Sequence, residues 1–295
     1  MERVRVDKKP NAIFCSDLHL REDIPVCRTD DFVQAQFDKL DYISALQRRY
    51  DCPVLHGGDL FDKWKPSPNL LRLAILHLPK QFYTIYGQHD LPQHSLELAD
   101  KCGINTLSAG KHLKILDGCH WGQEPTEASL ILHPWSTDRR EILVWHKMNY
   151  QGKKPWPGCT DPPALGLLRK YPQYDIILTG DNHKTFVEEY QGRYLINPGS
   201  MMRMDADQVD HKPCVFLWYA IDNTIKQVFL PIQQNVISRE HLEVKKERDA
   251  RIDAFVSQLD GEWEGTISFE ENLERFFQKN RTRHDTKSII YKSLE

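Results

Sequence analysis

The sequence predicts an α/β fold with a separate helical region at its C-terminal end. Short apolar runs of β type alternate with amphipathic helical segments early in the chain, which is typical of helices that cover the faces of a sheet. Many of these runs end in polar, glycine-containing turns. Beyond Pro231 the β-type runs stop, and charged amphipathic patterns replace them.

The composition is that of a globular protein. The chain has 295 residues, of which 40% are hydrophobic and 27% are charged. This length is enough to bury a full hydrophobic core, and this balance excludes global disorder. The formal net charge of -3 neither favours nor excludes a nucleic-acid partner, so such binding would depend on local patches.

Cysteine usage and apolar patterning predict a cytoplasmic protein. The seven cysteines are scattered without a C-x-x-C pair, which is typical of reduced thiols rather than of disulfides or a zinc-thiolate site. The apolar run from Cys214 to Ile221 is too short to cross a bilayer, and the first residues contain no apolar signal core. We therefore expect no membrane association.

Individual elements can be placed along the chain. One helix is expected at about 31–49, where apolar residues form a single stripe, and another after Ser67-Pro68, a favourable N-cap and N1 pair. From Lys111 onward helical patterns become rare, which predicts a second, more antiparallel sheet. Strands are expected at 12–15, 54–55, 82–86, 142–145, 176–178, 194–196 and 224–230.

Two regions follow from these patterns. Residues 1–230 contain all the expected strands and form the predicted catalytic domain. Residues 231–295 form the predicted helical appendage, with amphipathic helices at about 238–259 and 268–279.

Side chains of metal-ligand type follow successive expected strands. Asp17 and His19 lie two positions apart at a strand end, where alternation points both to the same side. Asp59 follows two glycines that permit a tight turn, which places it to bridge two ions. The other members are Gln88, His89, Asp90, His146, Asp181 and His183. Such carboxylates and imidazoles together suit Mn, Fe or Zn.

Any one of these residues has a simpler interpretation. A strand-end Asp usually caps a helix, and a lone His is usually a packed core or surface residue. Five such groups in this order, each after an apolar run, favour one shared metal site instead.

With these groups in their order, the sequence resembles the calcineurin-like metallophosphoesterases, whose blocks read D-x-H, G-D, G-N-H-D/E, H and G-H-x-H. The resemblance spans roughly residues 11–221 and implies a four-layer α/β/β/α sandwich that binds two divalent metal ions. The matching blocks are Asp17-Leu18-His19, Gly58-Asp59, Gly87-Gln88-His89-Asp90, His146 and Gly180-Asp181-Asn182-His183.

The resemblance also implies a role for each residue. His89 is nominated to protonate the leaving oxygen, with Asp90 orienting or charging its imidazole. The alternative for His89 is that it only packs within its loop. The resemblance implies that the first ion binds to Asp17, His19, Asp59 and His183. It implies that the second ion binds to Asp59, Gln88, His146 and Asp181.

Two positions depart from the family pattern, and both concern the second ion. Gln88 stands where the family has Asn, and Asp181 stands where it has the first His of G-H-x-H. Gln is longer than Asn and Asp is shorter than His, so the two changes can compensate. The added carboxylate would favour Mn²⁺ or Mg²⁺ over Zn²⁺, with Fe²⁺ also compatible. The alternative is a weakened or empty second site.

Within the superfamily, the sequence is most similar to the SbcD-type double-strand-break repair nucleases of bacteria and phages. Asn197-Pro198-Gly199-Ser200, with Arg203 close behind, carries this resemblance, and we expect Asn197, Ser200 and Arg203 to contact phosphate. The alternative is an ordinary turn and a surface arginine. The resemblance implies a DNA substrate and an ATPase partner that grips the C-terminal helices. A homodimer is also compatible with it.

Three functions remain open from the sequence. The first is a Mn²⁺-dependent phosphodiesterase, most specifically a DNA exonuclease or endonuclease that uses water activated by two metal ions. The second is a phosphatase or a phosphodiesterase that acts on small molecules or nucleotides. The third is a binding module in which Gln88 and Asp181 have disabled one metal site.

Overall fold

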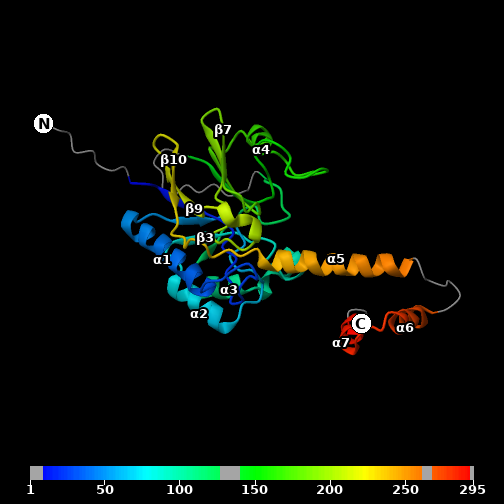
Figure 1. Ribbon diagram of the computed structural model, residues 1–295. Helices are drawn as coiled ribbons and strands as arrows, with labels where there is room; N and C mark the ends of the chain where they lie inside the picture. The colour runs from blue at the N-terminus through cyan, green and yellow to red at the C-terminus, as the bar shows by residue number, and fades with distance from the viewer. Residues whose placement is uncertain (1–8, 127–139, 261–267, 293–295) are drawn as a thin grey trace. The chain divides into compact units, whose positions relative to one another are not determined.

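The structure, a computed structural model, describes residues 9–126, 140–260 and 268–292 (Figure 1). It divides into two compact units, residues 1–238 and 239–295. Its strands are β1 Ala12–Cys15, β2 Val54–His56, β3 Phe82–Thr84, β4 Lys114–Ile115, β5 Ile142–His146, β6 Ile176–Gly180, β7 Phe186–Tyr190, β8 Arg193–Asn197, β9 Cys214–Tyr219 and β10 Thr224–Phe229. Its α-helices are α1 Phe32–Tyr50, α2 Pro68–His77, α3 Gly103–Ala109, α4 Ala164–Lys170, α5 Glu240–Asp260, α6 Phe269–Lys279 and α7 His284–Lys292.

The strands of the first unit form two sheets. The six-stranded sheet has the order β10-β9-β1-β2-β3-β4, with β1 to β4 parallel and β9 and β10 antiparallel. The four-stranded sheet has the order β5-β6-β8-β7, in which only β7 is antiparallel to its neighbour. Because β1, β2, β3, β5, β6 and β8 lie within parallel arrays, their carboxyl ends can gather polar loops at one edge of each sheet.

The apolar residues form three cores between four structural layers. In the core between the sheets, Phe14 and Trp218 of the larger sheet pack in one cluster with Val144 of the smaller sheet. A second core lies between the larger sheet and helices α1 to α3, and a third lies between the smaller sheet and α4. This arrangement confirms the predicted four-layer α/β/β/α sandwich.

The strand sequences account for this layering. In β1, Phe14 faces the other sheet, whereas Ile13 and Cys15 face the helices. In β5, Val144 faces the core between the sheets and Trp145 faces α4. Both strands are apolar on both faces, as expected for strands that are covered on each side.

The expected helices in the first part of the chain are present. In α1, Asp31 accepts a hydrogen bond from the Gln34 backbone N–H, and the helix ends at Asp51 in a left-handed conformation. In α2, Ser67 caps the helix by accepting from the Leu70 N–H, and Pro68 occupies the first turn.

The prediction of a more antiparallel second sheet is wrong. The strands β5, β6 and β8 are parallel, because α4 supplies the crossover between β5 and β6. This helix is only seven residues long and directly follows Pro162-Pro163, so its sequence has too few turns to show a helical period.

The first unit extends slightly beyond the expected boundary near residue 231. The backbone N–H of Thr29 donates to the Val236 carbonyl, and the N–H of Ser238 donates to the Cys27 carbonyl. These bonds tie the segment after β10 to the segment before α1.

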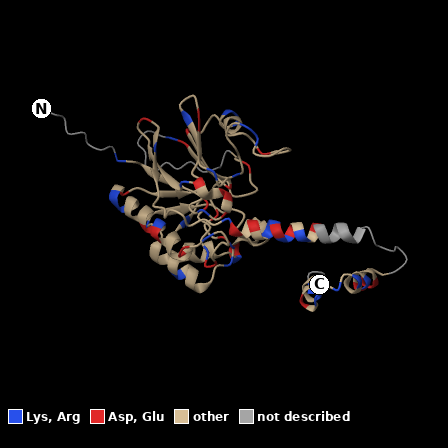
Figure 2. Ribbon diagram, viewed as in Figure 1, with Lys and Arg blue, Asp and Glu red and all other residues tan. Residues whose placement is uncertain are grey.

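The described residues of the second unit form the helices α5, α6 and α7. In α6, Ser268 and Glu271 form a reciprocal capping box, which fits the expected helix at 268–279. The hydroxyl of Tyr291 in α7 donates to Glu274 of α6 at 2.7 Å. Residues of both charge signs alternate along positions 240–253 of α5 (Figure 2). Among the described residues, none of the helices combines the length and apolar character needed to span a membrane.

We predict that Phe14→Ala lowers the free energy of unfolding by about 3–5 kcal/mol, because it leaves a cavity between the two sheets. Phe14 is 0% exposed and its ring stacks on Trp218 with centroids 6.0 Å apart. Phe229→Ala is the matched control, since Phe229 is 54% exposed, and should change stability by no more than about 0.5 kcal/mol. Urea denaturation measures both values. Equal losses in the two variants would contradict this account of the core.

Candidate metal centre

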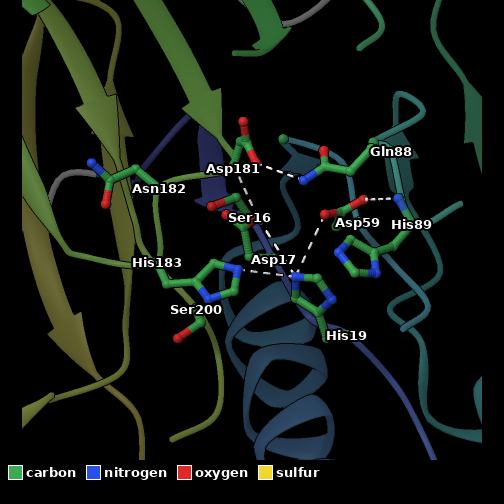
Figure 3. A network of polar contacts seen from close by, with 12 residues as sticks. Ser16, Asp17, His19, Asp59, Gln88, His89, Asp181, Asn182, His183 and Ser200 are labelled. Carbon is green, nitrogen blue, oxygen red and sulfur yellow. Dashed lines mark hydrogen bonds and ion pairs between the residues drawn. The ribbon is translucent and has the colours of Figure 1, made fainter. Parts of the chain in front are cut away.

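The predicted metal ligands converge at the carboxyl ends of strands from both sheets. The larger sheet supplies Asp17 and His19 after β1, Asp59 after β2 and Gln88 after β3. The smaller sheet supplies His146 at the end of β5 and the Asp181/His183 pair after β6. Figure 3 shows the side chains of Asp17, His19, Asp59 and His183 pointing into one common region.

Unusual backbone conformations direct several of these side chains. Asp17, His19, Asp59 and Asp181 have φ angles of 49°, 44°, 58° and 82°, in the left-handed region. Asp and His tolerate this region better than most residues, but it remains strained for both. The expected convergence of Asp17 and His19 therefore arises from these left-handed turns, and not from simple strand alternation.

Small residues let the loops approach one another closely. Gly58 has a φ of +97°, and a Cβ atom there would lie 2.5 Å from His146 Nδ1. A Cβ atom at Gly87 would overlap the Asp59 carboxylate. The glycine in each of these two blocks is thus required by the packing of the ligand residues.

Two groups of donor atoms share this region. His19 Nε2 lies 3.1 Å from His183 Nε2 and 4.0 Å from Asp17 Oδ1. Asp59 Oδ2 lies 3.5 Å from His19 Nε2 and 3.4 Å from His146 Nε2. The Asp59 oxygen therefore faces both groups, as a ligand that bridges two ions would. Within the described part of the chain, Asp17-His19-His183 and Asp17-Asp59-His146 each have ligand atoms within 4.8 Å of one another.

The two central carboxylates each have one fixed oxygen and one unpaired oxygen. Asp17 Oδ1 accepts from the Asp181 N–H, and Asp59 Oδ1 accepts from the His89 N–H, both at 2.9 Å. The other oxygens, Asp17 Oδ2 and Asp59 Oδ2, are buried and have no hydrogen-bond partner among the described residues. Buried polar atoms rarely lack a hydrogen-bond partner, and carboxylate oxygens of this kind commonly bind divalent cations. The residues present therefore fit a pair of divalent ions.

The two departures from the family pattern are in contact with each other. Gln88 Nε2 donates to Asp181 Oδ1 at 2.6 Å, and Gln88 Oε1 lies 2.6 Å from His146 Nε2. His146 Nδ1 donates to the Gly57 carbonyl, which turns Nε2 toward Asp59 and Gln88. Gln88, His146 and Asp181 thus form one connected group beside Asp59.

Burial and neighbouring charge shift the protonation of this centre. Burial lowers the pKa of His19 to about 3 and raises the pKa of Asp17. Burial also opposes the charge on His146, but the carboxylates of Asp59, Asp17 and Asp181 outweigh it and raise the pKa of His146 to about 10. Asp17 and His146 therefore both favour their protonated forms, and a divalent ion would bind here in competition with those protons.

Asp90 has a different position from the one expected. Its carboxylate accepts backbone N–H bonds from Asp59, Leu60, Phe61 and Gly87, at 2.9 to 3.3 Å. Burial and the Asp59 charge raise the pKa of Asp90 to about 7, although hydrogen bonds from Phe61 and Gly87 oppose that rise. The expectation that Asp90 orients the His89 imidazole is not supported, because these bonds instead join the loops after β2 and β3.

The His89 imidazole has another partner. Its Nδ1 donates to the Asp62 carbonyl at 3.0 Å, and its ring meets the His19 ring edge-on with centroids 4.8 Å apart. The side chain is half-buried, so it lies beside the metal ligands and remains accessible to a substrate.

The three residues expected to bind phosphate are buried and bonded to the protein itself. Asn197 Nδ2 donates to the Lys184 carbonyl at 2.7 Å, and Ser200 Oγ donates to the Met202 carbonyl at 2.8 Å. Arg203 donates to the Val209 and Gln233 carbonyls. Asn197 thus bonds the loop that carries His183, and the expected phosphate contacts of Asn197 and Ser200 stay a prediction.

Asp62 is a site residue that the sequence analysis missed. Its Oδ1 lies 3.7 Å from His19 Nδ1 and accepts from Arg21 Nη1 at 3.2 Å. This distance is too long for a hydrogen bond, and His19 Nδ1 has no hydrogen-bond partner among the described residues. Asp62, His19 and His89 instead form a third group whose ligand atoms lie within 4.8 Å of one another. The available signal is the run Gly58-Asp59-Leu60-Phe61-Asp62, whose second carboxylate lies three residues after the predicted bridging ligand.

The sequence matches the model of the calcineurin-like phosphoesterase superfamily domain over residues 11–217. The chain belongs to that superfamily. A comparison of the sequence with curated proteins finds no match. The superfamily implies bound divalent metal ions, for which the geometry above supplies the ligands.

Several solved structures are similar to this chain, all at low sequence identity and with TM-scores below 0.5. They include an archaeal phosphodiesterase with 13% identity and a TM-score of 0.41, covering 74% of this chain and 99% of its own. A putative 5′-nucleotidase from Staphylococcus aureus has 12% identity and a TM-score of 0.45, with 81% of this chain and 58% of that protein covered. A Vps29 mutant from Entamoeba histolytica has 14% identity and a TM-score of 0.35, and the match covers 75% of this chain and 99% of the Vps29 chain.

We predict that Asp59→Asn reduces metal binding from two Mn²⁺ ions per chain to one or none, while the chain remains folded. The amide keeps an oxygen for the His89 N–H but replaces the bridging Oδ2 with a donor, which repels a cation. Elemental analysis after Mn²⁺ loading and desalting measures the ion count. Asp100→Asn, at an exposed site, is the control and should bind as the parent chain does. An unchanged count in Asp59→Asn would exclude the bridging role.

Proposed function

We propose that the chain is a phosphodiesterase dependent on two divalent metal ions, with Mn²⁺ as the preferred ion and DNA as the substrate. The observation that carries this proposal is the position of Asp59 Oδ2, which is buried, has no hydrogen-bond partner among the described residues and lies 3.4 to 3.5 Å from imidazoles of both ligand groups. A carboxylate in this position serves as the shared ligand of a two-ion site.

The proposed ligand sets divide around Asp59. One side has Asp17, His19 and His183, whose ligand atoms lie close together. The other side has His146, which lies close to Asp17 and Asp59, and Gln88, which contacts His146 and connects Asp181 to it. The oxygen atoms of Gln88 and Asp181 make the second side richer in oxygen, which favours Mn²⁺ or Mg²⁺. When bound, such an ion pair supplies charge to a phosphoryl group and lowers the pKa of water between the ions.

His89 is the proposed proton donor to the leaving oxygen. Its Nδ1–H is engaged by the Asp62 carbonyl, so Nε2 is the nitrogen available to carry and release a proton. The backbone N–H of the same residue holds Asp59 Oδ1, which couples the position of His89 to that of the bridging carboxylate. Proton donation therefore takes place beside the ions rather than at a separate site.

A line of rings leads from the metal centre to the surface and supports a nucleic-acid substrate. The centroids of His89 and His94 are 6.5 Å apart, and those of His94 and Trp121 are 5.8 Å apart. His94 is exposed and has a strained φ of 56°, and its Nδ1 bonds the Gln88 carbonyl. Trp121 is anchored by its backbone N–H, which donates to the Tyr86 carbonyl. Flat accessible rings fixed beside a reaction centre can stack on a nucleobase.

Three substrates test the proposed activity with Mn²⁺ present: linear DNA, bis(p-nitrophenyl) phosphate as a diester, and p-nitrophenyl phosphate as a monoester. We expect cleavage of the DNA and the diester, with much slower release from the monoester. Efficient hydrolysis of the monoester alone would contradict the diesterase proposal and favour a phosphatase. Inactivity toward all three with every divalent ion would favour a binding module.

We predict that His89→Asn lowers kcat for the diester by about 100-fold or more, the usual contribution of a general acid. The variant should still bind two Mn²⁺ ions, because His89 holds Asp59 through its backbone N–H. Steady-state kinetics and elemental analysis measure the two properties. Near-parental kcat would remove His89 from the mechanism, and loss of the ions would show that it acts as a ligand.

We predict that Trp121→Ala raises KM about 10-fold for thymidine 5′-(p-nitrophenyl) phosphate, because stacking on one base contributes about 1–3 kcal/mol. KM for methyl p-nitrophenyl phosphate should not change, since that diester has the same leaving group and no base. Trp156→Ala is the control, because Trp156 is exposed and is not part of the line of rings. Equal effects of Trp121→Ala on both diesters would show that Trp121 does not contact the nucleoside.

A further inference from the structure

A cavity of about 190 Å³ lies at the side of α1, bounded by Arg28, Asp30, Arg203 and residues 231–233. Its volume is several times the roughly 30 Å³ that a water molecule occupies in the liquid, so a small ion and accompanying water molecules fit inside. The proposed metal ligands do not line this cavity. It therefore needs an explanation of its own.

Three buried cationic side chains line the cavity. Arg28, Lys39 and Arg203 are only 8%, 5% and 5% exposed. Lys39 lies on the buried face of α1, where the neighbouring buried positions include Phe37 and Leu40. A buried charge is costly unless an opposite charge or several hydrogen bonds compensate it.

Only one of these cations has a close carboxylate partner. Arg28 forms a two-point ion pair with Asp30, with contacts of 2.8 and 2.5 Å. Arg203 bonds only the neutral carbonyls of Val209 and Gln233. Among the described residues, neither Lys39 nor Arg203 forms a salt bridge.

The compensation of Lys39 is weak. Its Nζ lies 3.4 Å from the Ala35 carbonyl, one turn earlier, which in an α-helix already accepts the backbone N–H of Lys39 itself. Asp38 also lines the cavity, but it is exposed and its carboxylate accepts from the Gln34 amide. The cavity wall thus carries more buried positive than negative charge.

The pKa values of Lys39 and Arg203 agree with an excess of buried positive charge in the cavity wall. Burial, with a smaller contribution from the charges of Arg28 and Arg203, lowers the pKa of Lys39 to about 8, and Asp30 and Asp38 oppose this only in part. Burial and the Arg28 charge also lower the pKa of Arg203. An anion in the cavity would relieve this repulsion.

We propose that this cavity binds a phosphate-type oxyanion, with Lys39 and Arg203 as its main charge partners. The planar guanidinium of Arg203 and the ammonium of Lys39 both match phosphoryl oxygens, the first as a fork and the second as a point charge. The anion is either free inorganic phosphate or the terminal phosphate of a polynucleotide. The site needs no metal ion, so it is independent of the proposed activity.

Calorimetric titration with inorganic phosphate, on full-length protein treated with EDTA, tests the site. We expect the parent chain to bind one phosphate and Lys39→Met to bind it at least 10-fold more weakly. Arg48→Met is the matched control, because Arg48 is an exposed cation on the same helix, and it should bind as the parent chain does. Phosphate binding that is absent in the parent chain, or equal in Lys39→Met, would overturn the proposal.

The melting temperature separates a ligand site from a structural role of Lys39. In phosphate-free buffer, Lys39→Met should melt no lower than the parent chain, since the change removes an uncompensated buried charge. Added phosphate should raise the melting temperature of the parent chain and of Arg48→Met, but not that of Lys39→Met. A Lys39→Met chain that melts lower without phosphate would show that the ammonium stabilises the fold, and would overturn the proposal.

Oligonucleotides with and without a 5′-phosphate distinguish the two sources of the anion. Tighter binding of the phosphorylated strand that disappears in Lys39→Met identifies the strand terminus as the ligand. Lys39-dependent binding of inorganic phosphate alone identifies the free ion. No Lys39 effect with either ligand contradicts the site. Because all these titrations omit metal ions, they can succeed when metal-dependent cleavage fails, and the reverse also holds.

Discussion

The site depends on one buried carboxylate that connects the two sheets. Asp59 belongs to the larger sheet, yet its Oδ2 faces His146 of the smaller sheet at 3.4 Å as well as His19 of its own sheet at 3.5 Å. Its Oδ1 is held by the His89 N–H from the loop after β3. The ligand groups therefore meet only where the two sheets pack on each other through the apolar core, and any shift of one sheet against the other would separate them. The geometry of the site therefore depends directly on the packing of the two sheets.

Several features around Asp59 reduce the stability of the fold, and all of them serve to bring the ligand residues together. Asp90 is buried to hold four backbone N–H groups, including that of Asp59, and Gly58 is the residue that allows His146 to approach. Asp17 and His19 accept left-handed backbone conformations in order to face the same centre. Strain, buried charge and unpaired oxygens at one place are typical of functional sites, because a protein selected for stability alone would remove them. Backbone strain, buried charge and oxygens without hydrogen bonds all occur in one small region, where the carboxyl ends of strands from the two sheets meet.

The sequence predicted most of the layers and most of the ligands, but not their supporting contacts. Strand runs and the stripe of α1 are periodic over many residues, so they could be recognised, whereas α4 is too short to show a period. The ligand types could be collected because each follows a strand. The role of Asp90 in joining two loops could not be predicted, because its partners are backbone N–H groups, which have no signature in the sequence. Lys39 was unrecognisable for a related reason: a helical stripe shows which face is buried, but not which polar residue on that face lacks a partner.

The two departures from the family blocks are best understood as one change. Asp181 as a carboxylate can only accept, so the amide NH₂ of Gln88 must face it, and the Gln88 oxygen is then directed to His146. A shorter amide at position 88 would give up the reach to Asp181, and a histidine at position 181 would no longer fix the amide orientation. Either reversal alone would therefore leave a buried polar atom without its partner. The side chains beside Asp59 are mutually satisfied as they stand, because both nitrogens of His146 donate to oxygen atoms. A second ion would bind His146 Nε2 only in place of the proton that this nitrogen shares with Gln88 Oε1.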